Sequence, residues 1–83
     1  MRILYFAWLR TKVGMAEETV TPPEGVTDVA GLLDWLSGRG PGHADALARK
    51  EAIRVAVNQD FARPGDPVGP DDEVAIFPPV TGG

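Results

Sequence analysis

The sequence predicts an α+β domain of two layers, in which one main helix covers one face of a mixed sheet of about four to five strands. Strand-like apolar runs occur near both ends of the chain, and one amphipathic helical stripe lies between them. No internal repeat is present. The length of 83 residues corresponds to one domain.

The first strand is predicted over residues 2–9, "RILYFAWL", which are strand formers without glycine or proline. Its alternation places Ile3 and Tyr5 on one face and Phe6 and Trp8 on the other. Both faces are apolar, which is typical of a central strand.

Residues 10–16, "RTKVGMA", are expected to form a loop. A shorter strand follows at residues 17–21, with Val20 facing inward. Pro22 and Pro23 end this strand because neither can donate a ladder hydrogen bond.

The main helix is predicted within residues 27–38, where one apolar stripe has the spacing i, i+3, i+4, i+7. The stripe consists of Val29, Leu32, Leu33 and Leu36. Thr27 or Asp28 can cap its first free N–H groups, and Gly38 is expected to end it in a left-handed conformation. Residues 43–50, "HADALARK", predict a short second helix.

The third strand is predicted in residues 52–59, "AIRVAVNQ", and the last in residues 73–77, "EVAIF". Turn residues fill the segment 63–72 between them. Val74 and Ile76 would face the helix, which turns Phe77 outward.

One helix leaves the other face of the sheet uncovered, and that face carries aromatic side chains. Alternation predicts that the outward residues are Phe6, Ala56, Ala75 and Phe77, joined by Trp8 and the loop residue Phe61. We interpret this cluster as a surface that docks a partner, because exposed aromatic patches are typical of interfaces. The alternative is that loop 59–70 folds over the cluster.

Composition excludes several classes of function. The absence of cysteine rules out a disulfide framework, a cysteine zinc site, an iron–sulfur cluster and a catalytic thiol. The net charge is −4 and the basic residues are scattered, so no nucleic-acid partner is expected. There is no signal peptide and no apolar run that could span a bilayer. We therefore expect a cytoplasmic protein with no membrane partner.

Residues outside the apolar pattern carry weaker signals. His43 is the single histidine and is expected to be an ordinary surface residue, so no metal site is predicted. Arg10, Lys12 and Arg63 are placed in loops, where they could pair with acidic groups of a partner or simply be solvated. Trp35 lies on the flank of the helical stripe and is expected at the edge of the core.

The chain ends "AIFPPVTGG", which predicts a domain over residues 1–77 and a flexible tail over residues 78–83. Pro78 and Pro79 cannot extend the sheet and hold an extended segment. Val80 and Thr81 could be gripped by a groove. Gly82 and Gly83 carry no side chains, so a narrow tunnel could admit them. The tail can reach at most about 20 Å, enough to enter a partner's active site.

The chemical group at the tip of this tail is a carboxylate, which is a poor electrophile. No residue of the chain is placed to activate it, so activation requires an outside enzyme that adenylates Gly83 with ATP. The adenylate could accept a sulfur nucleophile, giving a thiocarboxylate, or an amine, giving a protein conjugate. The chain itself is expected to bind no cofactor.

The segments "YFAWLRTKVG", "VAVNQ" and "DDEVAIFPPVTGG" resemble the molybdopterin synthase small subunits, a family of ubiquitin-like (β-grasp) sulfur carriers in molybdenum-cofactor biosynthesis. The resemblance covers nearly the whole chain, and the last segment is the most specific. Thr11 departs from the family, whose members often carry an acidic residue there.

The resemblance implies that Gly83 is adenylated by an activating enzyme and converted to a thiocarboxylate. The chain would then be the sulfur-donating subunit of molybdopterin synthase, without catalytic activity in isolation. Its tail would insert into the large subunit and donate sulfur to cyclic pyranopterin monophosphate. Two small and two large subunits would form a heterotetramer, docked through Phe6, Phe61 and Phe77.

Three other functions remain open. Gly83 could be joined to lysines of target proteins, as in a ubiquitin-like modifier. The chain could carry sulfur in the thiamine pathway. It could also be a plain interaction module whose tail has no chemistry.

Overall fold

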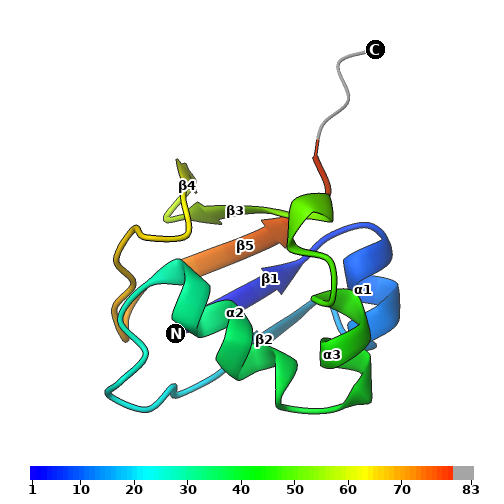
Figure 1. Ribbon diagram of the computed structural model, residues 1–83, viewed down its shortest axis with the longest axis horizontal. Coiled ribbons are helices and arrows are strands. Elements are labelled where there is room, and N and C mark those ends of the chain that lie inside the picture. The colour runs from blue at the N-terminus through cyan, green and yellow to red at the C-terminus, as the bar shows by residue number, and fades with distance from the viewer. Residues whose placement is uncertain (80–83) are drawn as a thin grey trace.

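The computed structural model describes residues 1–79 and contains a five-stranded mixed sheet with its helices packed beside it (Figure 1). The strands stand in the order β2-β1-β5-β3-β4. The predicted α+β architecture and the mixed sheet are therefore confirmed. The strands are β1 (Arg2–Tyr5), β2 (Glu17–Thr19), β3 (Arg54–Val57), β4 (Asp60–Ala62) and β5 (Glu73–Phe77). The helices are α1 (Trp8–Val13), α2 (Val29–Ser37), α3 (Pro41–Ala46) and the 3₁₀ turn η1 (Lys50–Ala52).

The sheet contains one parallel pair. Strands β1 and β5 run parallel, whereas β1–β2, β3–β4 and β3–β5 are antiparallel. Consequently the C-terminal ends of β1 and β5 lie at the same end of the sheet, together with the start of β3. The chain continues from β5 into Pro78 and Pro79 at this end (Figure 1).

The hydrophobic core lies between the sheet and α2, as the apolar stripe predicts. All four stripe residues are buried, as are the inward-facing residues of the central strands. They pack with Ile3, Tyr5, Val55, Val74 and Ile76. Asp28 is the N-cap residue of α2, and its Oδ1 accepts a 2.8 Å hydrogen bond from Gly31 N. Gly38 follows the helix with φ −82°, so the predicted left-handed ending is wrong.

The predicted first strand is too long, and the predicted loop after it is wrong. Strand β1 ends at Tyr5, and α1 occupies residues 8–13. Ala7 turns the chain with φ 55° and ψ −133°. Leu9 is then fully buried, and Gly14 ends the helix at φ 93°, a left-handed conformation that suits glycine. Burial of Leu9 favours the helix over the intrinsic strand preference of "YFAWL".

Helix α3 begins earlier than predicted, with Pro41 in its first turn, and packs against α1. The contact is close at Gly42, where a Cβ atom would lie 2.5 Å from the backbone oxygen of Lys12. Only glycine permits this approach, because 2.5 Å is far inside van der Waals contact.

Strand β4 falls in the segment where the sequence predicts a loop. Asn58 and Gln59 form the two-residue turn from β3 to β4, with φ values of 51° and 73°. Positive φ at both central residues is the geometry of a tight hairpin. Asn58 also donates from Nδ2 to Asp72 Oδ1 (2.9 Å) and accepts from Glu73 N (3.0 Å), which ties the hairpin to β5.

Among residues 1–79, every helix is too short or too polar to cross a lipid bilayer.

Candidate docking surface at the root of the tail

Three aromatic residues singled out in the sequence meet beside the tail root: Phe6 follows β1 directly, Phe61 lies in β4, and Phe77 ends β5. We call the set Phe6, Phe61, Phe77, Pro78 and Pro79 the aromatic surface. The parallel β1–β5 pairing is extended by a 3.1 Å hydrogen bond from Phe6 N to Ile76 O. That bond places Phe6 next to the end of β5.

Exposure differs among the aromatic side chains. Phe61 is 81% exposed and Phe6 is 47% exposed, while Phe77 is half-buried. Loop 59–70 therefore leaves Phe61 and Phe6 open to solvent. Trp8 is partly exposed as well, but it opens α1 instead of continuing the strand.

Two aromatic rings meet on the outer face of the sheet, across the intervening strand β3. Ala56 lies opposite Ala75 on β5 and opposite Phe61 on β4. The rings of Phe61 and Phe77 lean on each other with centroids 5.9 Å apart and an interplanar angle of 52°. Such tilted aromatic pairs are favourable, so these two side chains form one apolar unit next to the small Ala56 and Ala75.

Two shallow hollows flank Phe77. One is lined by Phe6, Ala75, Phe77, Pro78 and Pro79. The other is lined by Arg54, Val55, Phe61, Ala62, Phe77 and Pro79. Pro78 and Pro79, predicted as part of the tail, are half-buried in this arrangement. Among residues 1–79, Arg54 is the one charged side chain that lines these two hollows.

The remaining predicted tail residues, Val80, Thr81, Gly82 and Gly83, lie outside the residues that the structure describes. Their proposed roles stay predictions, as does the boundary between domain and tail.

A polar cluster that the sequence did not predict lies on the opposite, inner side of the sheet. His43 was expected at the surface, but it is only 9% exposed, so that prediction is wrong. Its Nε2 lies 2.7 Å from Oε2 of Glu18, which also accepts a 2.7 Å hydrogen bond from the Tyr5 hydroxyl. Arg39 stands 3.6 Å from the other Glu18 oxygen. We call Tyr5, Glu18, Arg39 and His43 the Glu18 cluster.

Burial and hydrogen bonding shift two acidities in this cluster. Burial, together with the hydrogen bond to Glu18, raises the pKa of the Tyr5 hydroxyl far above its ordinary value. Burial by itself raises the pKa of Glu18, but hydrogen bonds from His43 and Tyr5 and the charge of Arg39 outweigh it, so the pKa of Glu18 is lowered. Within residues 1–79 no three potential metal ligands come together. Because its hydrogen bonds connect β1, β2 and α3, the Glu18 cluster ties these three elements together.

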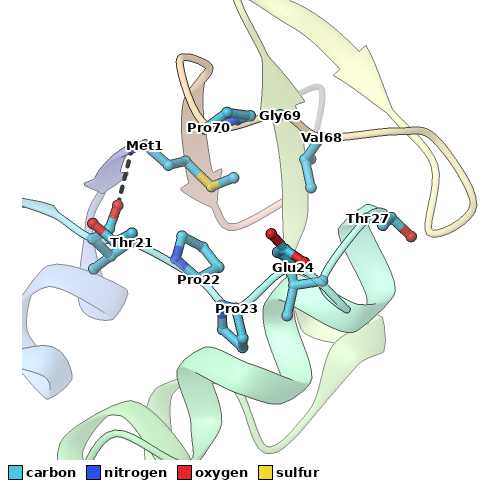
Figure 2. A pocket seen from close by; sticks show the side chains of 11 residues that line it. Met1, Thr21, Pro22, Pro23, Glu24, Thr27, Val68, Gly69 and Pro70 are labelled. Carbon is cyan, nitrogen blue, oxygen red and sulfur yellow. Dashed lines mark hydrogen bonds between the residues drawn. The ribbon is translucent and has the colours of Figure 1, made fainter.

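An apolar hollow of about 380 Å³ lies at the other end of the sheet, between the segments 20–27 and 68–70 (Figure 2). Met1 spans its edge, and its ammonium group donates to Val20 O at 3.0 Å. Pro22, Pro23 and Val68 form much of the wall. The hollow is remote from the aromatic surface, because it lies beside the start of β5.

The other predicted residues are placed as follows. Lys12 lies in α1 and pairs with Asp45 at 2.8 Å. Trp35 packs at the edge of the core, as predicted. The guanidinium carbon of Arg39 lies over its ring, 4.9 Å from the ring centroid. Arg10 and Arg63 are exposed, Arg10 in α1 and Arg63 just after β4.

Comparison with known proteins gives similarity over the full chain. A family model described as the ThiS family matches residues 3–83. The molybdopterin synthase sulfur carrier subunit of Homo sapiens is 33% identical over 88 residues, covering 100% of this chain and 93% of that protein. The subunit of the same name from Escherichia coli is 35% identical over 83 residues, covering 100% and 99%.

Solved structures of similar proteins have the same fold over nearly the whole chain. A putative molybdopterin converting factor, subunit 1, from Pyrococcus furiosus has a TM-score of 0.80 at 28% identity, covering 95% of each chain. Small archaeal modifier protein 1 of Haloferax volcanii has a TM-score of 0.76 at 30% identity, covering 96% of this chain and 97% of that chain.

Proposed function

Because the chain belongs to the ThiS family and has the ubiquitin-like β-grasp fold, we propose that it is the sulfur carrier and small subunit of a molybdopterin synthase. The observation that carries the proposal is the position of the aromatic surface. Phe6, Phe77, Pro78 and Pro79 line one hollow at the point where the chain leaves the sheet toward "VTGG". A partner bound on this surface would receive the terminal residues directly.

The proposed chemistry takes place at the carboxylate of Gly83. An activating enzyme transfers AMP from ATP to this carboxylate and releases pyrophosphate. Hydrosulfide then forms a C–S bond at the carbonyl carbon, and AMP leaves with the electron pair of the bond that breaks. The product is a thiocarboxylate, whose sulfur forms a bond to cyclic pyranopterin monophosphate. Water then cleaves the acyl–sulfur bond, which leaves the sulfur on the substrate and restores the carboxylate of Gly83. Gly82 and Gly83 suit this task because they have no side chains to obstruct approach to the backbone.

The proposed partner is the large subunit of molybdopterin synthase, in a heterotetramer of two small and two large subunits. Phe6, Phe61 and Phe77 would bury their exposed area against it. Aromatic residues contribute strongly at interfaces because they remove large apolar areas from water. Pro78 and Pro79 would hold the departing chain extended, which lowers the entropy lost on insertion.

Mass spectrometry of the chain purified from its own cell tests the proposal. Replacement of one terminal oxygen by sulfur should raise the intact mass by the difference between the two elements. The signal should disappear when Gly83 is deleted, while thermal unfolding stays nearly unchanged. A purified chain that is never thiolated, even together with its activating enzyme and a sulfur source, would refute the proposed function.

A second candidate is favoured by one structural relative, small archaeal modifier protein 1. In that function the adenylated Gly83 would accept a lysine amine and form an isopeptide bond with a target protein. Denaturing immunoblots of cell extracts distinguish the two: a ladder of conjugates that needs Gly83 favours the modifier. Free chain with a thiolated terminus, and no ladder, favours the carrier.

A further inference from the structure

The cations of this chain differ in whether they have a carboxylate partner. Within residues 1–79, five of the eight Lys and Arg side chains stand within 4.0 Å of a carboxylate. These five are Arg2, Lys12, Arg39, Arg49 and Lys50. Arg10, Arg54 and Arg63 have no such partner in the described part of the chain. A cation without a partner is free to pair with another molecule.

Arg54 is the unpaired cation that borders the aromatic surface. It is the first residue of β3, and the antiparallel register places it opposite Phe77. It lines the same hollow as Phe61, Phe77 and Pro79. The charge of Arg54 thus stands at the tail root, beside the most exposed aromatic side chain of the surface.

The guanidinium group of Arg54 is held in place by the backbone. Its Nη1 donates to Ile53 O at 2.9 Å and to Glu51 O at 3.4 Å. The carboxylate of Glu51 is engaged by Arg49 at 3.2 Å, so it does not neutralise Arg54. A guanidinium group offers five N–H donors in a rigid plane, and these two bonds use only one of its nitrogens.

We propose that Arg54 is a specificity-determining residue of the docking surface, and that the large synthase subunit presents a carboxylate to it beside the apolar contact. The proposal rests on the proposed function and names the chemistry of its partner. A charged hydrogen bond next to buried aromatic rings is shielded from water and therefore strong. It would also fix the orientation of the carrier, because apolar contacts alone are not directional.

The overall charge of the chain makes this local charge informative. At a net charge of −4, an acidic patch on a partner would be repelled by most of the surface. Arg54 instead offers a positive charge at the point where the tail leaves the sheet. Among the described residues, Arg10 and Arg63 also lack a carboxylate partner, but neither lines the two hollows of the aromatic surface. On the rest of this negatively charged chain the partner's carboxylate would be repelled, which disfavours docking there.

Titration calorimetry with the large subunit from the same cell tests the proposal at low and at moderate salt. Arg54→Glu should weaken binding by about tenfold or more, as for loss of a charge-assisted contact, and Arg54→Gln by several-fold. Arg54→Gln should also flatten the dependence of affinity on salt, and Arg54→Lys should retain part of the affinity. The matched control is Arg10→Glu, which changes the charge equally at an exposed, unpaired site in α1 and should have less than a twofold effect.

The outcomes separate the inference from the proposed function. If Arg54→Glu and Arg10→Glu have equal effects, or if Arg54→Glu impairs only adenylation by the activating enzyme, the inference is overturned while the function stands. If the wild-type chain does not bind the large subunit at all, the proposed function falls and the inference with it. Thermal unfolding of each variant is the check on folding, and because Arg54 is exposed it should be unchanged.

Discussion

Replacement of Glu18 by alanine should destabilise the domain far more than a surface substitution. Glu18 accepts hydrogen bonds from the Tyr5 hydroxyl and from His43 Nε2, both at 2.7 Å. Tyr5 is 2% exposed and His43 is 9% exposed, so water cannot replace the lost acceptor freely. Each buried donor left without a partner costs about 1–3 kcal/mol.

The magnitude follows from these two donors. Their costs would sum to roughly 2–6 kcal/mol, but neighbouring groups are not additive, so we expect about 3 kcal/mol. That loss is large against the roughly 5–15 kcal/mol that stabilise a typical domain. Glu18→Gln keeps an acceptor and should lose less. In a Tyr5→Phe background, Glu18→Ala should lose less as well, because one of the donors is already absent.

Equilibrium unfolding in urea measures the loss as a shift of the midpoint at constant slope. The matched control is Glu17→Ala, one residue earlier in β2, where the carboxylate is half exposed and pairs with Arg2 at 2.7 Å. Exposed pairs contribute about 0–1 kcal/mol, so this variant should stay close to wild type. Equal losses at Glu17 and Glu18 would refute the assignment of the Glu18 cluster as a buried tie.

Three more outcomes are expected. Folding lowers the pKa of Glu18, so the contribution of this carboxylate to stability is present above its unfolded pKa and is lost as the pH falls through its folded pKa. When the free energy of unfolding is measured against pH, Glu18→Gln should therefore show a smaller loss in acid than the wild type. Gly42→Ala should lower the unfolding temperature, because its Cβ would meet Lys12 O at 2.5 Å, whereas Gly25→Ala, with nothing within 4 Å, should not. Phe77→Ala should weaken large-subunit binding by about 1 kcal/mol or more, and unaltered affinity in calorimetry would place the dock elsewhere.

Long, regular patterns were predicted well from the sequence. The stripe of α2, its Asp28 cap and the alternation in β5 have the periods that burial on one side imposes, whereas in β3 Ala56, predicted outward, is buried as well. Alternation also placed Phe6 and Phe77 on the outer face. The same reasoning could have placed Arg54 there, since it alternates with the buried Val55. A single exposed arginine carries no pattern that marks it as part of a binding surface.

Short elements were predicted poorly. Helix α1 contains six residues and β4 contains three, too few to display a period. In α1 the local preference of "YFAWL" for strand is overridden by the burial of Leu9 after the turn at Ala7. The signal that could have found this helix is the spacing of Leu9 and Val13 before Gly14, which is that of one helical face with a glycine stop.

The prediction that His43 lies at the surface is wrong for a different reason. A lone histidine in "GPGHAD" has no nearby partner in sequence, and its actual partner, Glu18, is 25 residues away. Packing of α3 against α1, which depends on the missing side chain of Gly42, helps hold His43 beside β2. The sequence around His43 contains no signal that predicts its contact with Glu18.

Taken alone, the order of residues determined the fold class, the inward and outward faces of the long strands, and the pair Gly82 and Gly83, which have no side chains. These follow from local preferences and from periods of two and 3.6, which each segment carries within itself. Tertiary structure alone decided that Phe61 leans on Phe77, that Arg54 lies beside them, and that Glu18 ties Tyr5 to His43. These contacts depend on strand register and helix packing, and both emerge only when distant segments bury their apolar faces together.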